Sequence, residues 1–510
     1  MSGQAVLGKR RKRFESLVGA MAGVRLHGAA SVQVTGIAYD SRKVEPGWVF
    51  IAVRGEHVDG HSFIPQAVDR GAAALVVEAG REAGISPPPG GAVAVVPDTR
   101  AAMAAIARTF YDDPSSRLVL AGVTGTNGKS TTALMMDAIF RAAGYTSGVI
   151  GTLEYRIADR KMKAPHTTPE AVDLQGLLAE MVEAGVTHAA MEVSSHALSL
   201  HRSDGCHFAA AVFTNLTPEH LDFHPTMEDY FAAKRLLFTD PQYLPAPGER
   251  VNAINIDDGA GEILAREAIG LTTTYGLSSG AHCRAEEIDL RPEGTSFLAI
   301  HPSGRAPIRM KLIGEFNVYN ALGALAACLG LGVDPEAAYA AIEQMNPVRG
   351  RFERVASKVR NVLVDYAHSP DGLRRALETA KRVTEGRVIV VFGCGGDRDR
   401  TKRPVMGELA SRLADLCVVT SDNPRSERPE AIIGEILAGI PKETRGRCSV
   451  EPDRASAIRL AIEQATTDDL VLVAGKGHED YQIFADRTVH FDDREVAQEV
   501  LREIEGSGDG

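Results

Sequence analysis

The stretch Gly122-Val-Thr-Gly-Thr-Asn-Gly-Lys-Ser130 carries three glycines and ends in a lysine followed by a hydroxyl residue. It follows the apolar run 118–121, which predicts a strand, and precedes residues 131–143, where apolar side chains recur at helical spacing. A glycine-rich turn between a strand and a helix directs backbone N–H groups and the helix N-terminus at an anion. The stretch therefore predicts a phosphate-binding loop for ATP or GTP, with Lys129 on the outer phosphates and Ser130 on Mg²⁺.

The composition is that of a globular protein with several domains. The 510 residues are enough for roughly three domains, and the hydrophobic fraction of 44% and charged fraction of 24% are ordinary. No apolar run approaches the roughly 20 residues that span a bilayer. The formal net charge of −11 argues against a nucleic-acid partner. We therefore interpret the basic run Lys9-Arg-Arg-Lys-Arg13 as a solvated terminus.

The six cysteines are scattered along the chain without a C-x-x-C pair, which predicts a reduced, cytoplasmic environment. Cys206, His207, His220 and His224 are the residues that most resemble a set of metal ligands. A second cysteine at zinc-finger spacing is missing, so we do not expect structural zinc.

The chain divides into three blocks. The first, residues 1–115, mixes short β-like runs with helical stretches, whereas the second, residues 116–345, alternates strands and helices after the phosphate loop. The third, residues 346–510, alternates more regularly. This pattern predicts an α/β fold in which parallel sheets carry helices on their faces and ligands lie beyond the carboxyl ends of the strands. The strands that bear on the site are expected at 188–193, 209–215, 362–366, 416–421 and 470–474.

Three features of the second block are chemically suggestive. Glu192, at the end of an expected strand, is placed to hold Mg²⁺ beside the phosphate loop. His220, after the next strand, is either a second metal ligand or a histidine satisfied in the core. In Glu315-Phe-Asn-Val-Tyr-Asn320, the asparagines either present amides to a purine or cap a helix. Lys234 lies on an expected helix, and nothing in its local sequence indicates more than a solvated charge.

The third block contributes three polar motifs. Gly350-Arg-Phe-Glu353 places an arginine at a block junction, where it can clamp the γ-phosphate or pair with a surface acid. Asp422-Asn-Pro-Arg425 follows an expected strand, and its carboxylate, amide and guanidinium suit an amino acid that bears both ammonium and carboxylate. Gly475-Lys-Gly-His-Glu479 follows another expected strand, and its charged groups likewise suit an amino acid that bears both ammonium and carboxylate. Each motif alone is only a weak signal of a turn.

Taken together, these motifs resemble those of the Mur ligase family, ATP-dependent amide-forming enzymes of peptidoglycan precursor synthesis. The resemblance also includes Asp40-Ser-Arg42, Asp365-Tyr-Ala-His-Ser369 and Gly393-Cys-Gly-Gly-Asp-Arg398, so it covers nearly the whole chain. It implies a three-domain α/β architecture. Residues 1–115 would bind the UDP part of a substrate, residues 116–345 would form a central P-loop ATPase-like domain with a parallel sheet, and residues 346–510 would form a Rossmann-like domain for the incoming amino acid.

Within the family, the motifs are most similar to those of members that add meso-diaminopimelate to UDP-N-acetylmuramoyl-L-alanyl-D-glutamate. The resemblance implies that these two compounds and ATP are the substrates, that Mg²⁺ is the cofactor and that the chain is a monomer. A lysine-adding member is the closest alternative, and the intact Asp-Asn-Pro-Arg motif speaks against it. A folylpolyglutamate synthase should lack the first block, and a non-enzymatic P-loop switch would not need the third.

The family's site residues carry over by position. Those implied to bind ATP are Gly125, Thr126, Asn127, Gly128, Lys129, Ser130, Thr131, Asn320, Arg351 and Asp365. Those implied for the UDP substrate are Ser41, Glu56, His57, Val58, Thr167, Thr168, Ser194 and Arg202. Those implied for diaminopimelate are Arg398, Asp422, Asn423, Pro424, Arg425, Gly475 and Glu479. The catalytic residues implied are Lys129, Glu192, His220 and Lys234, and the Mg²⁺ ligands are Ser130, Glu192, His220 and Lys234, the last as a carbamate (N6-carboxylysine).

Overall fold

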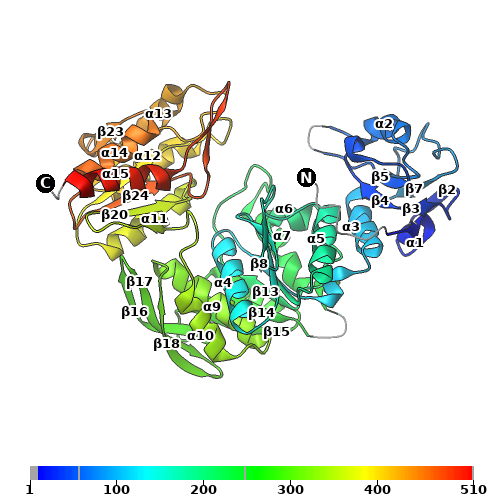
Figure 1. The fold of residues 1–510 in the computed structure, drawn as a ribbon, viewed down its shortest axis with the longest axis horizontal. Coiled ribbons are helices and arrows are strands. Elements are labelled where there is room, and N and C mark those ends of the chain that lie inside the picture. The colour runs from blue at the N-terminus through cyan, green and yellow to red at the C-terminus, as the bar shows by residue number, and fades with distance from the viewer. Residues whose placement is uncertain (1–9, 56–57, 246–248, 508–510) are drawn as a thin grey trace.

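The structure, a computed structural model, describes residues 10–55, 58–245 and 249–507. Figure 1 shows three bodies that follow one another along the chain, with the first and third on opposite sides of the second, so that the molecule has the outline of an open V. Each body is built on its own sheet. Within the described ranges, no helix is both long and apolar enough to cross a membrane.

The first body has a five-stranded sheet that is parallel except for one edge strand. In spatial order its strands are β2 (Arg25–Gly28), β7 (Ala92–Val96), β6 (Ala74–Glu78), β5 (Trp48–Ile51) and β4 (Gly36–Ala38). Its helices are α1 (Phe14–Val18), α2 (Ile64–Asp69) and α3 (Thr99–Phe110). A short ribbon pairs β1 (Lys12–Arg13) with β3 (Gln33–Val34).

The basic N-terminal run is paired with acids where the structure describes it. The Arg10 guanidinium lies 2.5 Å from Asp112 and 2.8 Å from Glu183, and Lys12 also pairs with Asp112. Asp112 follows α3 of the first body, whereas Glu183 ends α5 (Ala171–Glu183) of the second. The interpretation as a solvated terminus is therefore wrong for Arg10 and Lys12, and Arg10 links the first body to the second.

The second body is built on an eleven-stranded sheet. In spatial order its strands are β11 (Arg160–Met162), β10 (Tyr155–Ile157), β9 (Ser147–Ile150), β12 (His188–Glu192), β8 (Val119–Thr124), β13 (Ala210–Phe213), β14 (Val251–Asn255), β15 (Leu271–Gly276), β16 (Cys283–Arg291), β17 (Gly294–His301) and β18 (Gly304–Met310). In this spatial order the seven strands β9, β12, β8, β13, β14, β15 and β16 run parallel, as the alternating pattern predicts. Antiparallel strands, which we did not predict, extend the sheet at both edges. The remaining helices of this body are α4 (Lys129–Ala142), α6 (Ser195–Ser199), α7 (Met227–Thr239), α8 (Gly259–Glu267), α9 (Glu315–Gly330) and α10 (Pro335–Gln344).

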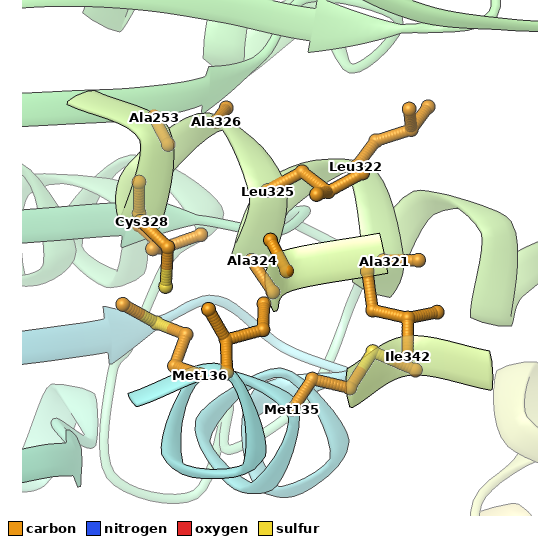
Figure 2. Packing of buried hydrophobic residues seen from close by; sticks show 14 of the residues in the cluster. Met135, Met136, Ala253, Ala321, Leu322, Ala324, Leu325, Ala326, Cys328 and Ile342 are labelled. Atoms are coloured by element: carbon orange, nitrogen blue, oxygen red, sulfur yellow. The ribbon is translucent and has the colours of Figure 1, made fainter. Parts of the chain in front are cut away.

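Helix α4, which begins at the phosphate loop, packs against α9 in a core of small and flexible side chains. Figure 2 shows Met136 of α4 facing Ala324 and Cys328 of α9, and Met135 extending toward Ile342 of α10. These five residues are buried. Alanines let the two helices approach closely, and the flexible methionine side chains fill the remaining gaps. This packing fixes the start of α4 relative to the sheet.

The third body has a six-stranded sheet, parallel except for β19. In spatial order its strands are β19 (Glu353–Val355), β20 (Asn361–Asp365), β24 (Leu470–Ala474), β21 (Val388–Phe392), β22 (Leu416–Val419) and β23 (Cys448–Val450). Its helices are α11 (Pro370–Val383), α12 (Lys402–Leu413), α13 (Pro429–Ala438), α14 (Arg454–Gln464) and α15 (Asp493–Ser507). A hairpin of β25 (Tyr481–Ile483) and β26 (Thr488–His490) completes it.

Candidate active site

The phosphate loop joins β8 to α4, as the sequence predicts. Gly125 and Gly128 have φ angles of 144° and 88°. A Cβ at Gly125 would lie 1.9 Å from Thr214 Oγ1, and one at Gly128 would lie 2.4 Å from Asn320 Oδ1. Both the backbone conformation and the close neighbours therefore demand glycine at these two positions.

We expect Gly125→Ala to lower the free energy of unfolding by about 2 kcal/mol, because alanine at this φ is strained and its methyl group meets Thr214. Urea titration followed by circular dichroism measures the loss. Gly144→Ala is the matched control: Gly144 also has a positive φ of 84°, but a Cβ there meets nothing within 4 Å. Equal losses in the two variants would contradict the steric part of the argument.

Lys129, the first residue of α4, folds back onto its own loop. Its Nζ donates hydrogen bonds to the carbonyls of Gly125 at 3.1 Å and Thr126 at 2.7 Å. Burial lowers the pKa of Lys129, and the carboxylates of Glu219 and Glu192 partly oppose that shift. An incoming phosphate would replace these carbonyls with a stronger, charged acceptor.

Lys234 on α7 reaches the same loop from another element. Its Nζ donates to the Gly125 carbonyl at 2.8 Å and lies 4.4 Å from the centre of the Tyr230 ring. The side chain is 1% exposed, so the local interpretation as a solvated charge is wrong. Burial, reinforced by the neighbouring Lys129, holds the pKa of Lys234 well below its usual range.

Glu192 ends β12 and is buried beside the loop. Its Oε1 accepts the backbone N–H of Thr152 at 2.7 Å, and its Oε2 accepts the Thr152 hydroxyl at 3.2 Å. Ser130 and Glu192 line one small cavity of about 10 Å³ together with Glu154. A hydroxyl and carboxylates are the oxygen donors that Mg²⁺ prefers, so these residues fit that ion. No group of three or more His, Cys, Asp or Glu side chains in the described chain is arranged to hold a metal by itself, and Mg²⁺ in such sites takes its other ligands from phosphates and water.

His220 lies at the rim of this region with φ 58°. Its ring centre is 4.8 Å from that of His196 and 6.2 Å from that of Tyr230, and its Nε2 is 3.9 Å from Glu219. The side chain is 43% exposed, so the alternative of a satisfied core histidine does not fit. Burial of part of the ring lowers the pKa of His220, which favours the neutral imidazole that can bind a metal.

The three other residues that most resemble metal ligands in the sequence have different surroundings. Cys206 is buried and accepts a hydrogen bond from Gln175, and the His207 ring contacts Asp113 and the Leu244 carbonyl. His224, in contrast, packs near His196 and Tyr230. Its buried Nε2 has no hydrogen-bond partner among the described residues.

A cavity of about 300 Å³ opens between the phosphate loop and the third body. Arg351 lines it, with its guanidinium 4.7 Å from the centre of the Tyr366 ring. Asn320 is buried within α9, and the residue that caps this helix is Gly314, so the capping interpretation of the asparagines is wrong. The expected ATP residues that border this cavity are Asn127, Gly128, Thr131, Asn320, Arg351 and Asp365.

Asp365 should give this cavity a measurable pH signature. Burial raises its pKa to about 6, although Arg351 and the Phe352 N–H oppose the shift. Because the folded pKa lies above the unfolded value of about 4, ionisation of Asp365 destabilises the fold as pH rises through this interval. We therefore expect the free energy of unfolding of Asp365→Asn to gain about 3 kcal/mol relative to the unsubstituted protein between about pH 4 and pH 7, seen as a rising difference in thermal midpoint.

Glu378→Gln, at a half-exposed carboxylate on α11, serves as the control for this measurement. It shows how the loss of a half-exposed carboxylate on the same body changes the thermal midpoint over the same pH range. A difference for Asp365→Asn that does not change with pH would contradict the raised pKa of Asp365.

The first body contains a cavity of about 650 Å³ that includes Ser41 and Val58. Ser41 donates its hydroxyl hydrogen to Gln66 Oε1 at 2.6 Å. Glu170 of the second body also lines the cavity, so the cavity lies at the junction of the two bodies. Glu56 and His57 lie outside the described residues.

A chain of polar contacts leads from this cavity to Glu192. The Arg202 guanidinium lies 2.9 Å from Glu170 and donates to the Thr168 carbonyl at 3.4 Å. The Thr168 hydroxyl donates to the Glu192 carbonyl at 2.8 Å and approaches Ser194 Oγ at 3.5 Å. The Thr167 hydroxyl lies 3.0 Å from the Thr152 hydroxyl, which donates a hydrogen bond to Glu192. The four residues expected on the muramoyl dipeptide therefore lie together.

In the third body, the loops after β22 and β24 meet. Asn423 Nδ2 donates to Glu479 Oε2 at 2.7 Å. Gly475 has φ 120°, and a Cβ there would lie 2.7 Å from Asp422 Oδ2. Lys476, which sequence reasoning passed over inside its motif, is fully buried and donates to Asn423 Oδ1 at 3.1 Å and Glu479 Oε2 at 3.2 Å.

Two arginines converge beside these loops. A Cβ at Gly395 would lie 2.9 Å from Arg425 Nη1 and 3.8 Å from Arg398 Cγ, so both side chains flank the same short segment. Arg425 Nη1 donates to the Gly396 carbonyl at 2.7 Å, and Arg398 Nη1 donates to the Asp397 carbonyl at 3.2 Å. These neutral acceptors leave both positive charges available to an anion.

One large cavity of about 1210 Å³ faces both the second and the third body. Thr152 and Thr167 line it from the Glu192 side, and Tyr366 and Glu479 line it from the third body. The cavity thus joins the region beside the phosphate loop to the loops that carry the amino-acid motif. An acid activated on one side and an amine held on the other would meet here.

Comparison with known proteins agrees with this arrangement. Three family models match the chain. The model described as "Mur ligase family, catalytic domain" matches residues 33–111, and "Mur ligase middle domain" matches residues 123–328. The model described as "Mur ligase, glutamate ligase domain" matches residues 350–477. The UDP-N-acetylmuramoyl-L-alanyl-D-glutamate–2,6-diaminopimelate ligase of Gloeobacter violaceus is 48% identical over 494 residues, which cover 96% of this chain and 98% of that protein. The chain belongs to the Mur ligase family.

Other Mur ligases show the same breadth of similarity. A protein of the same name from Geobacter metallireducens is 44% identical over 517 residues, covering 98% of this chain and all of that protein (100%). A solved structure of a UDP-N-acetylmuramoyl-L-alanyl-D-glutamate–2,6-diaminopimelate ligase has a TM-score of 0.71 at 32% identity, covering 97% of this chain and 99% of that one. The three-domain Mur ligase fold expected from the motifs is therefore confirmed.

Proposed function

We propose that this Mur ligase joins meso-diaminopimelate to the D-glutamyl γ-carboxylate of UDP-N-acetylmuramoyl-L-alanyl-D-glutamate and converts ATP to ADP and phosphate. The observation that carries the proposal is the cavity of about 1210 Å³ with Thr167 on one wall and Glu479 on the other. The names and identities of the full-length relatives favour the same substrates.

The proposed reaction has two steps. A γ-carboxylate oxygen attacks the γ-phosphorus of ATP and ADP leaves, which gives an acyl phosphate. The amine of diaminopimelate then attacks the acyl carbon, and the tetrahedral intermediate expels phosphate as the amide forms and the amine loses its proton. The protein's part is chiefly positioning and charge neutralisation. Lys129 and the amides of the phosphate loop supply positive charge where the phosphate oxygens lie.

The residues that would hold Mg²⁺ are Ser130, Glu192, His220 and Lys234, the last as a carbamate. When bound, the ion neutralises phosphate charge and orients the γ-phosphate. The depressed pKa of Lys234 supports carbamylation, because only the neutral amine can add to CO₂. In that addition an N–C bond forms and one proton is released, so a buried neutral amine becomes an anion suited to a metal.

Recognition of the amino acid falls to the third body. Arg425 and Arg398 would pair with the distal carboxylate of diaminopimelate, and Asp422 and Glu479 would accept hydrogen bonds from its ammonium group. The attacking amine must be neutral. The ammonium group of a free amino acid is mostly protonated near about pH 7.5, so it must lose a proton before it attacks.

The remaining assignments follow from the same reaction. Ser41 and Val58 would contact the uridine nucleotide in the cavity of the first body, and Glu56 and His57 belong to the same stretch of sequence. Arg202, Ser194, Thr167 and Thr168 would hold the muramoyl dipeptide. We assign the protein to the cytoplasm and treat it as a monomer; its six cysteines are free thiols, in keeping with a reducing compartment.

An ADP-release assay with UDP-N-acetylmuramoyl-L-alanyl-D-glutamate tests the proposal. We expect turnover with meso-diaminopimelate and little with lysine or without an amino acid. Equal turnover of lysine and diaminopimelate would refute the selectivity that we assign to the third body. Turnover only with a folyl substrate would overturn the proposed function.

A further inference from the structure

A fully buried ion pair lies beneath the amino-acid loops of the third body. Arg454, the first residue of α14, places Nε 2.7 Å from Asp493 Oδ1 and Nη2 2.7 Å from Asp493 Oδ2. Asp493 is the first residue of α15, and both side chains have an exposed fraction of zero. Figure 1 shows α14 and α15 side by side against the sheet of this body.

The same guanidinium also binds two backbone carbonyls at the ends of two different strands. Nη1 donates to the Ser421 carbonyl at 3.2 Å, and Nη2 donates to the Ala474 carbonyl at 3.0 Å. Ser421 follows β22, whereas Ala474 ends β24. These two strands are not neighbours, because β21 lies between them in the sheet.

Each of the two carbonyls immediately precedes a loop of the candidate amino-acid site. Asp422 follows Ser421, and Gly475 follows Ala474. A Cβ at Gly475 would lie 2.7 Å from Asp422 Oδ2 and 3.9 Å from Arg454 Nη2, so the two loops and the guanidinium are in close contact. A single planar group therefore sets the distance between the starting points of both loops.

We propose that Arg454, held by Asp493, is a positioning residue that fixes the spacing of the Asp422–Arg425 and Gly475–Glu479 loops and thereby the affinity for the amino-acid substrate. The inference rests on the proposed function only for the identity of that substrate. Arg454 lies below the loops and touches no substrate group. Its effect is transmitted through the backbone, where a shift of about 1 Å can lower a rate about a hundredfold.

The chemistry of the pair favours this role over general stabilisation. Arginine presents several donors in a rigid fork, so one side chain can bind a carboxylate on one edge and two carbonyls on another. Lysine keeps the charge but cannot make all of these contacts at once. A buried ion pair is in itself a poor source of stability, because desolvation of both charges offsets their attraction.

The test compares two neutral double variants of the full-length protein. Arg454→Met/Asp493→Asn removes the proposed device without leaving an unpaired buried charge. Arg387→Met/Asp469→Asn is the matched control, because Arg387 and Asp469 form another bidentate ion pair in the same body, 2.7 Å apart. These two residues lie just before β21 and β24, at the opposite end of the strands. Arg454→Lys is the conservative variant.

Hydrogen exchange and steady-state kinetics give independent results. In Arg454→Met/Asp493→Asn we expect faster exchange in residues 421–425 and 475–479 together and a roughly 10- to 100-fold higher KM for the amino acid, with the KM values for ATP and the UDP substrate unchanged. Arg454→Lys should fall between this variant and the unsubstituted protein. The control should change neither loop exchange nor the amino-acid KM.

Unchanged exchange in both loops would overturn the inference, and so would a control that raises the amino-acid KM as much as the test variant does. If the unsubstituted protein fails to use diaminopimelate, the proposed function fails. In that case the exchange data, together with the KM for whichever amino acid is used, still decide the role of Arg454.

Discussion

Arg425→Ala is expected to lower kcat/KM for meso-diaminopimelate by about 30- to several-thousand-fold, which corresponds to about 2–5 kcal/mol. The reason is that the distal carboxylate of the ligand would be desolvated opposite Arg398 alone, without its second cationic partner. The KM for the UDP substrate should change little, because the residues that we assign to it lie on the first two bodies. Steady-state ADP release with each substrate varied in turn measures both effects.

The neighbouring Arg428 offers a matched control for this substitution. Its side chain is 85% exposed, and its nearest acid is Glu430 at 3.7 Å. Arg428→Ala should leave all three KM values within about twofold of those of the unsubstituted protein, as expected for an exposed charge. A loss of diaminopimelate use as large as that of Arg425→Ala would indicate a general effect of charge instead of a specific contact.

Lys234→Met is expected to reduce kcat by about a hundred- to a thousandfold, the range seen when one preorganised stabilising group is removed. Methionine keeps the apolar stem that packs in the buried site but cannot form a carbamate. The adjacent Arg235, which pairs with Glu267 on the protein surface at 2.6 Å, provides the control Arg235→Met, which should remain active.

Carbamylation can be separated from a simple loss of charge. Small carboxylic acids such as formate can occupy the space vacated by the side chain and should restore part of the activity of Lys234→Met, because they return the missing carboxylate. Carbon-13 bicarbonate should give a carbamate resonance in the unsubstituted protein that is missing from Lys234→Met. An active Lys234→Met variant without added carboxylate would contradict the role that we propose.

Local sequence patterns were sufficient for much of the fold. The phosphate loop could be predicted because its strand, glycines and helix are adjacent in sequence, and β24 coincides with the expected strand 470–474. Strands β21, β22 and β24 of the third body are continuous apolar runs followed by polar turns, the arrangement that places polar side chains at one edge of a parallel sheet. For the same reason Asn423 and Glu479 could be expected near one another.

Other features depend on contacts that are distant in sequence. Strand β17 alternates buried and partly buried residues, but the union of β16, β17 and β18 with the parallel sheet depends on the pairing of β16 with β15. Lys234 is buried because its helix packs toward a loop more than a hundred residues away. The pairing of Arg454 with Asp493, across 39 positions, has no local signature at all.

The contacts of Arg10 and Lys12 bear on how the protein is handled in the laboratory. A shortened chain that begins after Lys12 would lose the Arg10–Glu183 ion pair between the first and second bodies, although it would keep the phosphate loop and the later motifs. Purification tags and crystallisation truncations are therefore best confined to the residues before Arg10.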